Sequence, residues 1–112
     1  LLSNAVKFTP AGGRVTLLAE WAPGSECMLA VRDTGIGMAP ESILLALEPF
    51  RQVASPLSRQ HEGTGLGLSL ARSLAECHGG RLELESALDK GTTARIFLPA
   101  SRCIAKRNAL SA

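Results

Sequence analysis

The sequence predicts an α+β fold, a two-layer α/β sandwich in which helices cover one face of a mixed, mostly antiparallel sheet. Two observations support this prediction. Segments with alternating apolar residues come in two pairs, and a short turn joins the members of each pair, as in β-hairpins. A segment with helical periodicity precedes each hairpin, so both helices must bury an apolar stripe on that sheet. A doubly wound sheet is excluded, because the strands do not alternate singly with helices.

The first half of the chain is predicted to hold a helix, a hairpin and a second, short helix. In order, these elements span residues 1–8, 14–21, 27–32 and 41–47. The first helix ends near Thr9, because a residue before proline is disfavoured in the α conformation. Pro40 suits the first turn of the short helix. No capping residue precedes Leu1, so we expect a domain truncated at its N-terminus, inside a helix.

The second half is predicted to hold a long loop, a long helix and a second hairpin. In order, these elements span residues 48–62, 66–78, 81–86 and 92–98. A loop of that length inside a compact domain is typical of a lid or a binding segment. Leu66, Leu70 and Leu74 recur every four residues and predict the buried stripe of the helix. We expect one domain over residues 1–99 and a polar, basic tail or linker over residues 100–112.

Composition narrows the class of protein. The 112 residues allow one domain with a modest core, and 46% hydrophobic residues are ordinary for a globular protein. A net charge of +2 with 4% aromatic residues does not indicate nucleic-acid binding. No apolar run is long enough to cross a bilayer, so this fragment is not expected to contact a membrane. Cys27, Cys77 and Cys103 are odd in number and far apart, which favours reduced thiols in a cytoplasmic protein.

Three residues of the first helix are candidates for binding a nucleotide. Asn4, Lys7 and Phe8 are three or four positions apart and share one helix face. An amide oxygen suits Mg²⁺, a lysine suits phosphate, and an aromatic ring can lie against a base. Taken singly, each residue has a commoner structural role, as a polar helix residue, a solvated charge or a core residue.

Asp33 closes the second predicted strand and precedes two glycines. Its carboxylate can accept a hydrogen bond from an exocyclic amine, while Gly35 and Gly37 let the backbone approach a flat ligand. An ordinary turn of Asp and Gly is the alternative. Thr92 begins the last strand and can offer a hydroxyl to the same base, or can serve as a strand former.

A second glycine-rich loop runs into the long helix. Gly63, Gly65 and Gly67 alternate with other residues, and backbone N–H groups at a helix start suit a phosphate. Arg51 and Arg59 of the preceding loop suit either a phosphate or the solvent. The P-loop, kinase H-R-D, H-E-x-x-H and G-x-S-x-G motifs are absent from the sequence.

Four segments occur together in an informative order. They are Ser3-Asn4-Ala5-Val6-Lys7-Phe8, Asp33-Thr34-Gly35-Ile36-Gly37, Glu48-Pro49-Phe50 and Gly63-Thr64-Gly65-Leu66-Gly67-Leu68. They resemble the N-box, first glycine box, F-box and second glycine box of sensor histidine kinases. These kinases belong to the ATPase superfamily that includes DNA gyrase, the Hsp90 chaperones and MutL. The resemblance covers residues 1–99.

The resemblance implies a Bergerat-type domain that binds ATP and Mg²⁺. Asn4 would be the metal ligand, Lys7 would contact phosphate, and both would be catalytic. Phe8 would flank the base, and Asp33 would accept the adenine amine. The other residues implied to bind the nucleotide are Gly35, Gly37, Gly63, Thr64, Gly65, Leu66, Gly67 and Thr92.

The resemblance also implies a reaction and its partners. The γ-phosphate would pass to a histidine on a separate dimerisation domain of the same protein. The parent protein would be a homodimer, and its partner would be a response regulator. Neither His61 nor His78 lies in the context of such an acceptor. The parent protein would be cytoplasmic or anchored in a membrane by another segment. The family's first strand and most of its first helix are missing before residue 1.

Two alternatives remain at this point. The chain could be a regulatory module that binds ATP without transferring phosphate, or a gyrase- or chaperone-like ATPase. The Glu48-Pro49-Phe50 segment and the string from Glu62 to Leu68 favour the kinase over the second alternative. The presence of Asn4, Lys7 and Asp33 favours an active domain over the first.

Overall fold

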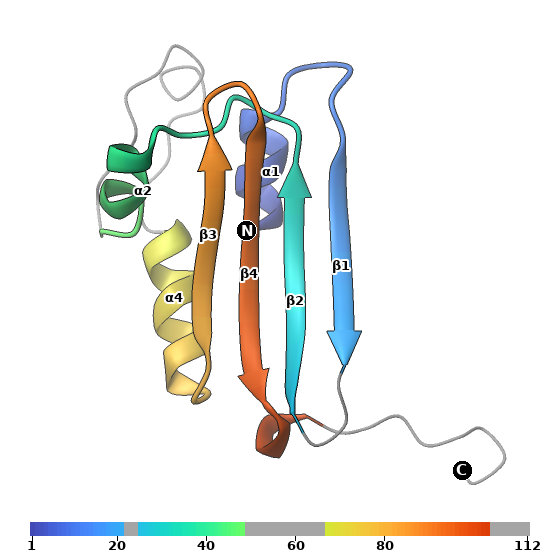
Figure 1. Ribbon diagram of the computed structural model, residues 1–112, viewed down its shortest axis with the longest axis vertical. Helices are drawn as coiled ribbons and strands as arrows, with labels where there is room; N and C mark the ends of the chain where they lie inside the picture. The colour runs from blue at the N-terminus through green and yellow to red at the C-terminus, as the bar shows by residue number, and fades with distance from the viewer. Residues whose placement is uncertain (22–24, 49–66, 104–112) are drawn as a thin grey trace, which may run out of the picture.

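The computed structural model describes residues 1–21, 25–48 and 67–103. It contains seven helices and strands and a final 3-10 turn (Figure 1): α1 (Leu2–Phe8), β1 (Val15–Trp21), β2 (Glu26–Asp33), α2 (Pro40–Ala46), α4 (Gly67–Cys77), β3 (Arg81–Ala87), β4 (Gly91–Pro99) and η1 (Ala100–Arg102). Each predicted helix and strand in the described residues is present, with ends that differ by at most one residue. The predicted loop at 48–62 falls almost entirely outside the described residues.

The sheet has four strands in the order β1-β2-β4-β3. All three neighbouring pairs are antiparallel, so the described strands contain no parallel pair. β2 and β4 occupy the centre, and the register aligns Asp33 with Val15 on one side and Thr92 on the other. The end of β2 and the start of β4 therefore lie together at the upper end of the sheet in Figure 1.

Helices cover one face of the sheet, as predicted. α1 contacts β1 and β2, α4 contacts β3 and β4, and α2 contacts β3. Most core positions are held by small residues, including Ala5 of α1, Ala75 of α4 and Ala94 of β4. Small side chains let the helix backbones approach the sheet closely. None of the described helices is long and apolar enough to cross a membrane.

The leucine stripe predicted for the long helix is not the buried one. Leu70 and Leu74 are 56% and 52% exposed, whereas Ser69 and Ala75 are buried. Periodicity gives the direction of an apolar stripe, but the neighbours available on each side decide which residues lose contact with water. α4 lies along the β3 side of the sheet and uses its small residues for the close contact (Figure 1). Leu66 lies outside the described residues.

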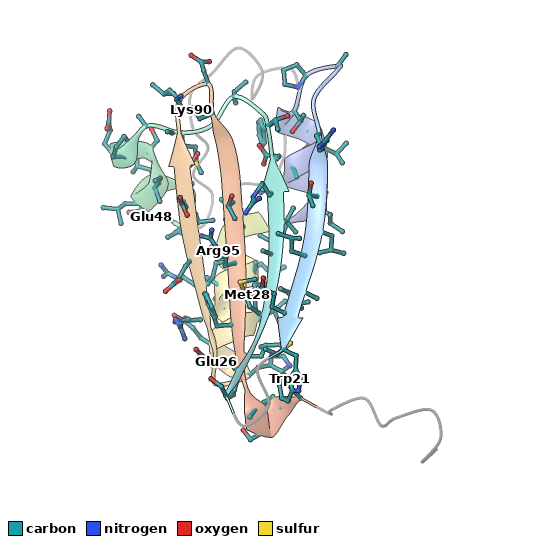
Figure 2. The ribbon with its side chains drawn as sticks, turned by 45° about the vertical axis from the view of Figure 1, so that its right-hand side comes forward. Trp21, Glu26, Met28, Glu48, Lys90 and Arg95 are labelled. Carbon is teal, nitrogen blue, oxygen red and sulfur yellow. The ribbon has the colours of Figure 1, made fainter. Side chains whose placement is uncertain are left out.

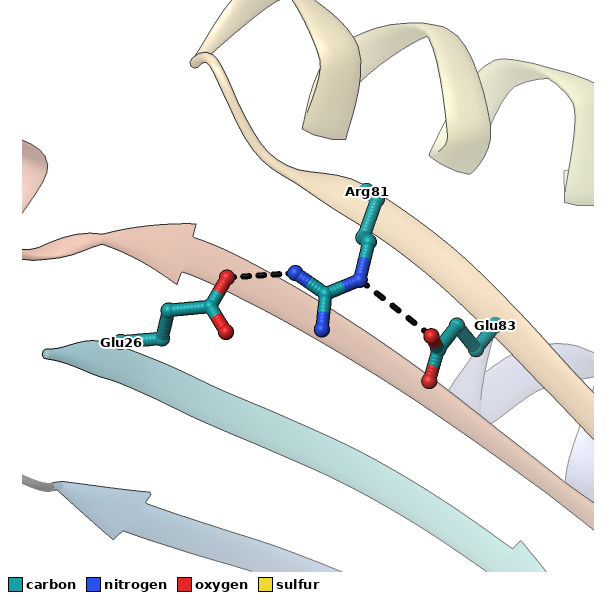
Figure 3. Close-up of polar contacts among 3 residues, drawn as sticks. All are labelled: Glu26, Arg81 and Glu83. Atoms are coloured by element: carbon teal, nitrogen blue, oxygen red, sulfur yellow. Dashed lines mark hydrogen bonds and ion pairs between the residues drawn. The ribbon is translucent and has the colours of Figure 1, made fainter.

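The other face of the sheet carries a row of charged pairs. Arg81 bonds to Glu26 and Glu83 (Figure 3). Its guanidinium also lies 4.0 Å from the centroid of the Phe97 ring. The hydrogen bond with Glu26, followed by that with Glu83, raises the pKa of Arg81 above its usual value. Arg95, in the middle of this face in Figure 2, pairs with Glu85 at 2.8 Å. Alternating opposite charges make this a water-facing surface, so a ligand pocket must be sought elsewhere.

Candidate functional site

Asp33 is the centre of the polar cluster at the upper end of the sheet. Its Oδ1 accepts hydrogen bonds from the backbone N–H groups of Gly35 at 2.9 Å and Thr92 at 3.2 Å. In residues 1–21, 25–48 and 67–103, both side-chain hydrogen bonds of Asp33 go to Oδ1. The carboxylate is thus held in one orientation by backbone groups, and within the part of the chain that the structure describes Oδ2 accepts no hydrogen bond.

Thr92 supports Asp33 through its backbone. Its backbone N–H holds the carboxylate, because the two residues are direct partners in the β2–β4 ladder. Its hydroxyl lies 2.8 Å from the Ser86 hydroxyl on the neighbouring strand β3. The link between Thr92 and Asp33 therefore depends on strand register, which any residue except proline could provide.

Ser86 joins three segments of the site and was missed by the sequence analysis. Its Oγ accepts from the Met38 N–H at 2.8 Å and donates to the Gly91 carbonyl at 2.9 Å. It thereby ties the loop after Asp33 to the β3–β4 turn. A serine in an alternating strand is unremarkable in sequence, so only the fold reveals this role.

We predict that Ser86→Ala loosens the loop that follows Asp33. The substitution leaves the partly buried Met38 N–H without its acceptor, which costs about 1–3 kcal/mol of unfolding free energy. Chemical denaturation measures this loss, and nucleotide affinity should fall in parallel. Ser101→Ala is a matched control, since Ser101 is exposed in η1 at the opposite end of the sheet. Equal stability of the two variants would contradict the assigned role.

Three glycines allow close backbone contacts around Asp33. A side chain at Gly35 would collide with the Phe8 carbonyl, and Gly37 has a φ of 68° and lies against the Ala87 carbonyl. Gly91, which the sequence analysis did not single out as a site residue, has a φ of 85° and lies against the Asp33 carbonyl. The conformations and contacts at these positions require glycine.

The first helix meets the same loop through its C-terminal end. The Phe8 carbonyl accepts a hydrogen bond from the Ile36 N–H at 3.2 Å. Phe8, Asn4 and Lys7 are all partly buried in α1. The described contact of Phe8 with this loop is made by its backbone, and the role of its ring beside a base stays a prediction.

Asn4 lies against the start of α4. A Cβ built on Gly67 would be 3.3 Å from Asn4 Nδ2 and 3.4 Å from Asn4 Oδ1. The N-box residue and the last glycine of the second glycine box are thus neighbours, although 63 positions separate them (67 − 4). An amide oxygen that can bind a hard cation therefore lies beside a helix N-terminus that favours an anion.

Some of the predicted binding residues lie outside the described part of the chain. They are Gly63, Thr64, Gly65 and Leu66, together with Arg51, Arg59 and His61 of the predicted lid. His78 is described, and its Nδ1 lies 2.7 Å from the Leu74 carbonyl at the end of α4. A carbonyl accepts, so Nδ1 carries the proton in this contact, and the ring caps the end of α4.

The described residues fit a magnesium nucleotide chemically. The Asp33 carboxylate can accept from an amine, Asn4 offers one neutral oxygen, and Gly35 and Gly37 hold the loop between them against the Phe8 and Ala87 carbonyls. Protein-bound Mg²⁺ commonly takes one or two protein oxygens and completes its shell with phosphates and water. Asp33 on β2 and Asn4 on α1 are the two residues whose chemistry would suit a base amine and a metal ion.

Comparison with known proteins gives a consistent result. A family described as histidine kinase-, DNA gyrase B-, and HSP90-like ATPases matches residues 1–102. The non-motile and phage-resistance protein of Caulobacter vibrioides is 47% identical over 102 residues, which are 88% of this chain and 12% of that protein. Histidine protein kinase DivJ from the same bacterium is 46% identical over 99 residues, 88% of this chain and 16% of that kinase. The chain thus spans less than a fifth of these relatives.

Solved structures agree with the sequence matches. A mycobacterial sensor histidine kinase, MprB, superposes with a TM-score of 0.73 at 31% identity, over 88% of this chain and 64% of the other. Full-length ShkA, solved in complex with AMPPNP, superposes with a TM-score of 0.70 at 34% identity, over 87% of this chain and 19% of ShkA. The sheet and the helices that cover it follow the architecture of these proteins.

Proposed function

Because this chain belongs to the family of histidine kinase-, DNA gyrase B- and HSP90-like ATPases, we propose that it binds ATP with Mg²⁺ and donates the γ-phosphate to a histidine. Within the family it matches the catalytic domains of two-component sensor histidine kinases. The acceptor histidine would lie on a dimerisation domain of the same protein. The single observation that carries the proposal is the placement of Asn4 beside Gly67, at the same end of the fold as Asp33.

The assigned roles follow from the chemistry of each side chain. Asp33 accepts the adenine amine through Oδ2, while its fixed Oδ1 sets the direction of that bond. Asn4 binds the metal through its amide oxygen, and Lys7 holds a phosphate oxygen from the same face of α1. When bound, Mg²⁺ neutralises charge on the phosphates. The protein's contribution to phosphoryl transfer is thus positioning and electrostatic stabilisation.

The second glycine box completes the proposed phosphate site. We assign backbone contacts with the phosphates to Gly63, Thr64, Gly65, Leu66 and Gly67. Gly67 supports this assignment, because it is the first residue of α4 and lies against Asn4. The N–H groups at the start of this 11-residue helix point toward the anion and favour its charge.

The proposed organisation of the parent protein follows from the matched share of the relatives. Residues 1–99 form the nucleotide domain, and residues 100–112 form a tail or linker; the family match ends within this second segment, at residue 102. The parent would be a homodimer whose phosphorylated histidine serves a response regulator. We place the domain in the cytoplasm, where ATP is available.

Transfer in trans tests the proposed reaction. We predict that the intact parent protein, mixed with Mg-ATP labelled at the γ-phosphate, transfers label to its own dimerisation domain supplied as a purified fragment. The product should be acid-labile and base-stable, as a phosphohistidine is. A dimerisation domain with its acceptor histidine replaced by alanine is the matched control and should stay unlabelled. Removal of Mg²⁺ with a chelator should stop the transfer.

The alternatives predict different outcomes of the same assay. A regulatory module would bind ATP without producing phosphohistidine, whereas a gyrase- or chaperone-like ATPase would release free phosphate. Several of the similar proteins, among them DivJ, CikA and PdhS, are histidine kinases by name, which favours the kinase. ATP binding without any labelled histidine would overturn the proposed reaction and leave the family assignment intact.

A further inference from the structure

Two of the three cysteines lie together at the end of the sheet opposite the nucleotide site. Cys27 is the second residue of β2, and Cys103 follows η1 at the end of β4. The register pairs Glu26 with Pro99 and Cys27 with Leu98, so β2 begins where β4 ends. Figure 1 shows η1 at this lower end of the sheet, beside the start of β2.

The turn after β4 brings the second thiol back to the sheet. The Cys103 N–H bonds to the Ala100 carbonyl at 3.1 Å, and its Sγ lies 3.4 Å from the Pro99 carbonyl. Pro99 is the ladder partner of Glu26, and Leu98 is that of Cys27, so the Cys103 sulfur lies at the strand end next to Cys27. Both cysteines are partly buried and both are free thiols. Cys77, in contrast, is exposed at the end of α4.

We propose that Cys27 and Cys103 form a reversible disulfide, which makes the lower end of the sheet a redox-sensitive site. A disulfide needs sulfurs about 2.0 Å apart and Cβ atoms about 3.8 Å apart. The turn after β4 already returns the Cys103 sulfur to Pro99, next to the residue that pairs with Cys27. Cys103 follows a single 3-10 turn and is not part of a strand, so its approach leaves the β2–β4 ladder intact. Reversible disulfides of this kind are usual in redox-sensing proteins of reducing compartments.

The oxidant for this step is a hydroperoxide. The Cys27 thiolate attacks the peroxide, so that an S–O bond forms, the O–O bond breaks, and one water leaves after protonation. The Cys103 sulfur then attacks the Cys27 sulfenic acid, so that the S–S bond forms and a second water leaves. The two cysteines lose two electrons and two protons in total, and hydrogen peroxide is reduced to two waters.

The order of attack follows from the environment of Cys103. Partial burial, followed by the hydrogen bond with the Cys27 side chain, raises the pKa of the Cys103 thiol above its usual value. Cys103 therefore stays protonated to higher pH, which assigns the first attack to Cys27. Asp33 is six residues further along β2, about 20 Å away, so the bond forms without touching the groups that recognise the base.

Peroxide treatment of the intact protein tests the proposal. The expected product is an intramolecular link between the peptides that contain Cys27 and Cys103. The protein should lose the mass of two hydrogens on oxidation and regain it on reduction with dithiothreitol. Cys77→Ser is the matched control and should form the same link. Cys103→Ser should not form the link. Because Cys103 lies outside the strands, this variant should keep the sheet intact. Links between molecules through Cys77, or a sulfinic acid on Cys27 with Cys103 still free, would overturn the proposal.

The chain's single tryptophan provides an independent readout. Trp21 is the direct partner of Cys27 in the β1–β2 ladder, so both side chains lie on the same face of the sheet. A disulfide quenches a neighbouring indole, and fluorescence should therefore fall on oxidation and recover on reduction. The Cys77→Ser variant should show this change and Cys103→Ser should not. An identical loss of fluorescence in both variants would contradict a Cys27–Cys103 bond.

Discussion

Replacement of Asp33 by asparagine is expected to weaken ATP binding about 100-fold. Oδ1 accepts two backbone N–H groups, from Gly35 and Thr92, so the amide oxygen of an asparagine must take that position. The amide nitrogen then faces the ligand and presents a donor to the adenine amine, which is also a donor. Loss of a charge-assisted hydrogen bond and an unpaired donor together cost about 3 kcal/mol, or roughly two orders of magnitude in affinity.

Calorimetric titration with a non-hydrolysable ATP analogue measures the Asp33 effect. Asp89→Asn is the matched control, because it removes the same charge from an exposed turn residue. Asp89 has a φ of 61°, a conformation that asparagine adopts readily, so this control should fold normally. If Asp33→Asn bound the analogue as tightly as Asp89→Asn, adenine recognition would have to lie elsewhere.

Replacement of Asn4 by aspartate is expected to lower the rate of phosphoryl transfer about 10²–10³-fold, the usual cost of losing one preorganised group at a charged transition state. The new carboxylate would lie beside the start of α4, where we place the phosphates, and would repel them. It would also replace a neutral metal ligand by a charged one and so change the position of the ion. ATP affinity should fall less than the transfer rate, because the adenine contacts are unchanged.

Initial rates of transfer to the dimerisation domain measure the Asn4 effect. Ser3→Asp is the matched control, since it adds the same charge one position earlier, on an exposed part of the same helix. Asn4→Ala separates the two causes, because it removes the amide without adding a charge. Transfer at the wild-type rate by Asn4→Asp would refute the metal assignment.

The predictability of this fold differs between its elements. The hairpins were predictable because alternation and turn residues are local signals, and each strand of the structure agrees with its predicted range to within two residues. The exposure of Leu70 was not predictable, because a helical stripe does not reveal which neighbour covers it. Leu17 of β1 is likewise 60% exposed, although it shares a face with the buried Val31. β1 is an edge strand, and strand position is a property of the whole sheet.

The candidate site, like the fold, could be predicted from the sequence only in part. The residue types and the order of Asn4, Lys7, Asp33 and the glycine boxes are written in the sequence, and they were sufficient to indicate the family that the comparisons show. The supporting positions were not apparent. Ser86 and Gly91 act on the loop after Asp33 from strands β3 and β4, which follow it by about fifty residues. Such contacts depend on register, and register is settled when the strands pair.

The sequence by itself determined the class of fold, the family and the chemical groups of the proposed pocket, because these follow from local periodicity and from ordered motifs. Only the tertiary structure decided which atoms meet. It directed the N–H groups of Gly35 and Thr92 to Oδ1 of Asp33, and it set Asn4 against Gly67. It also placed Cys27 and Cys103 at the same end of the β2–β4 ladder. The physical reason is that hydrogen bonds and thiol contacts act over a few ångströms, and only chain packing brings residues distant in sequence within that range.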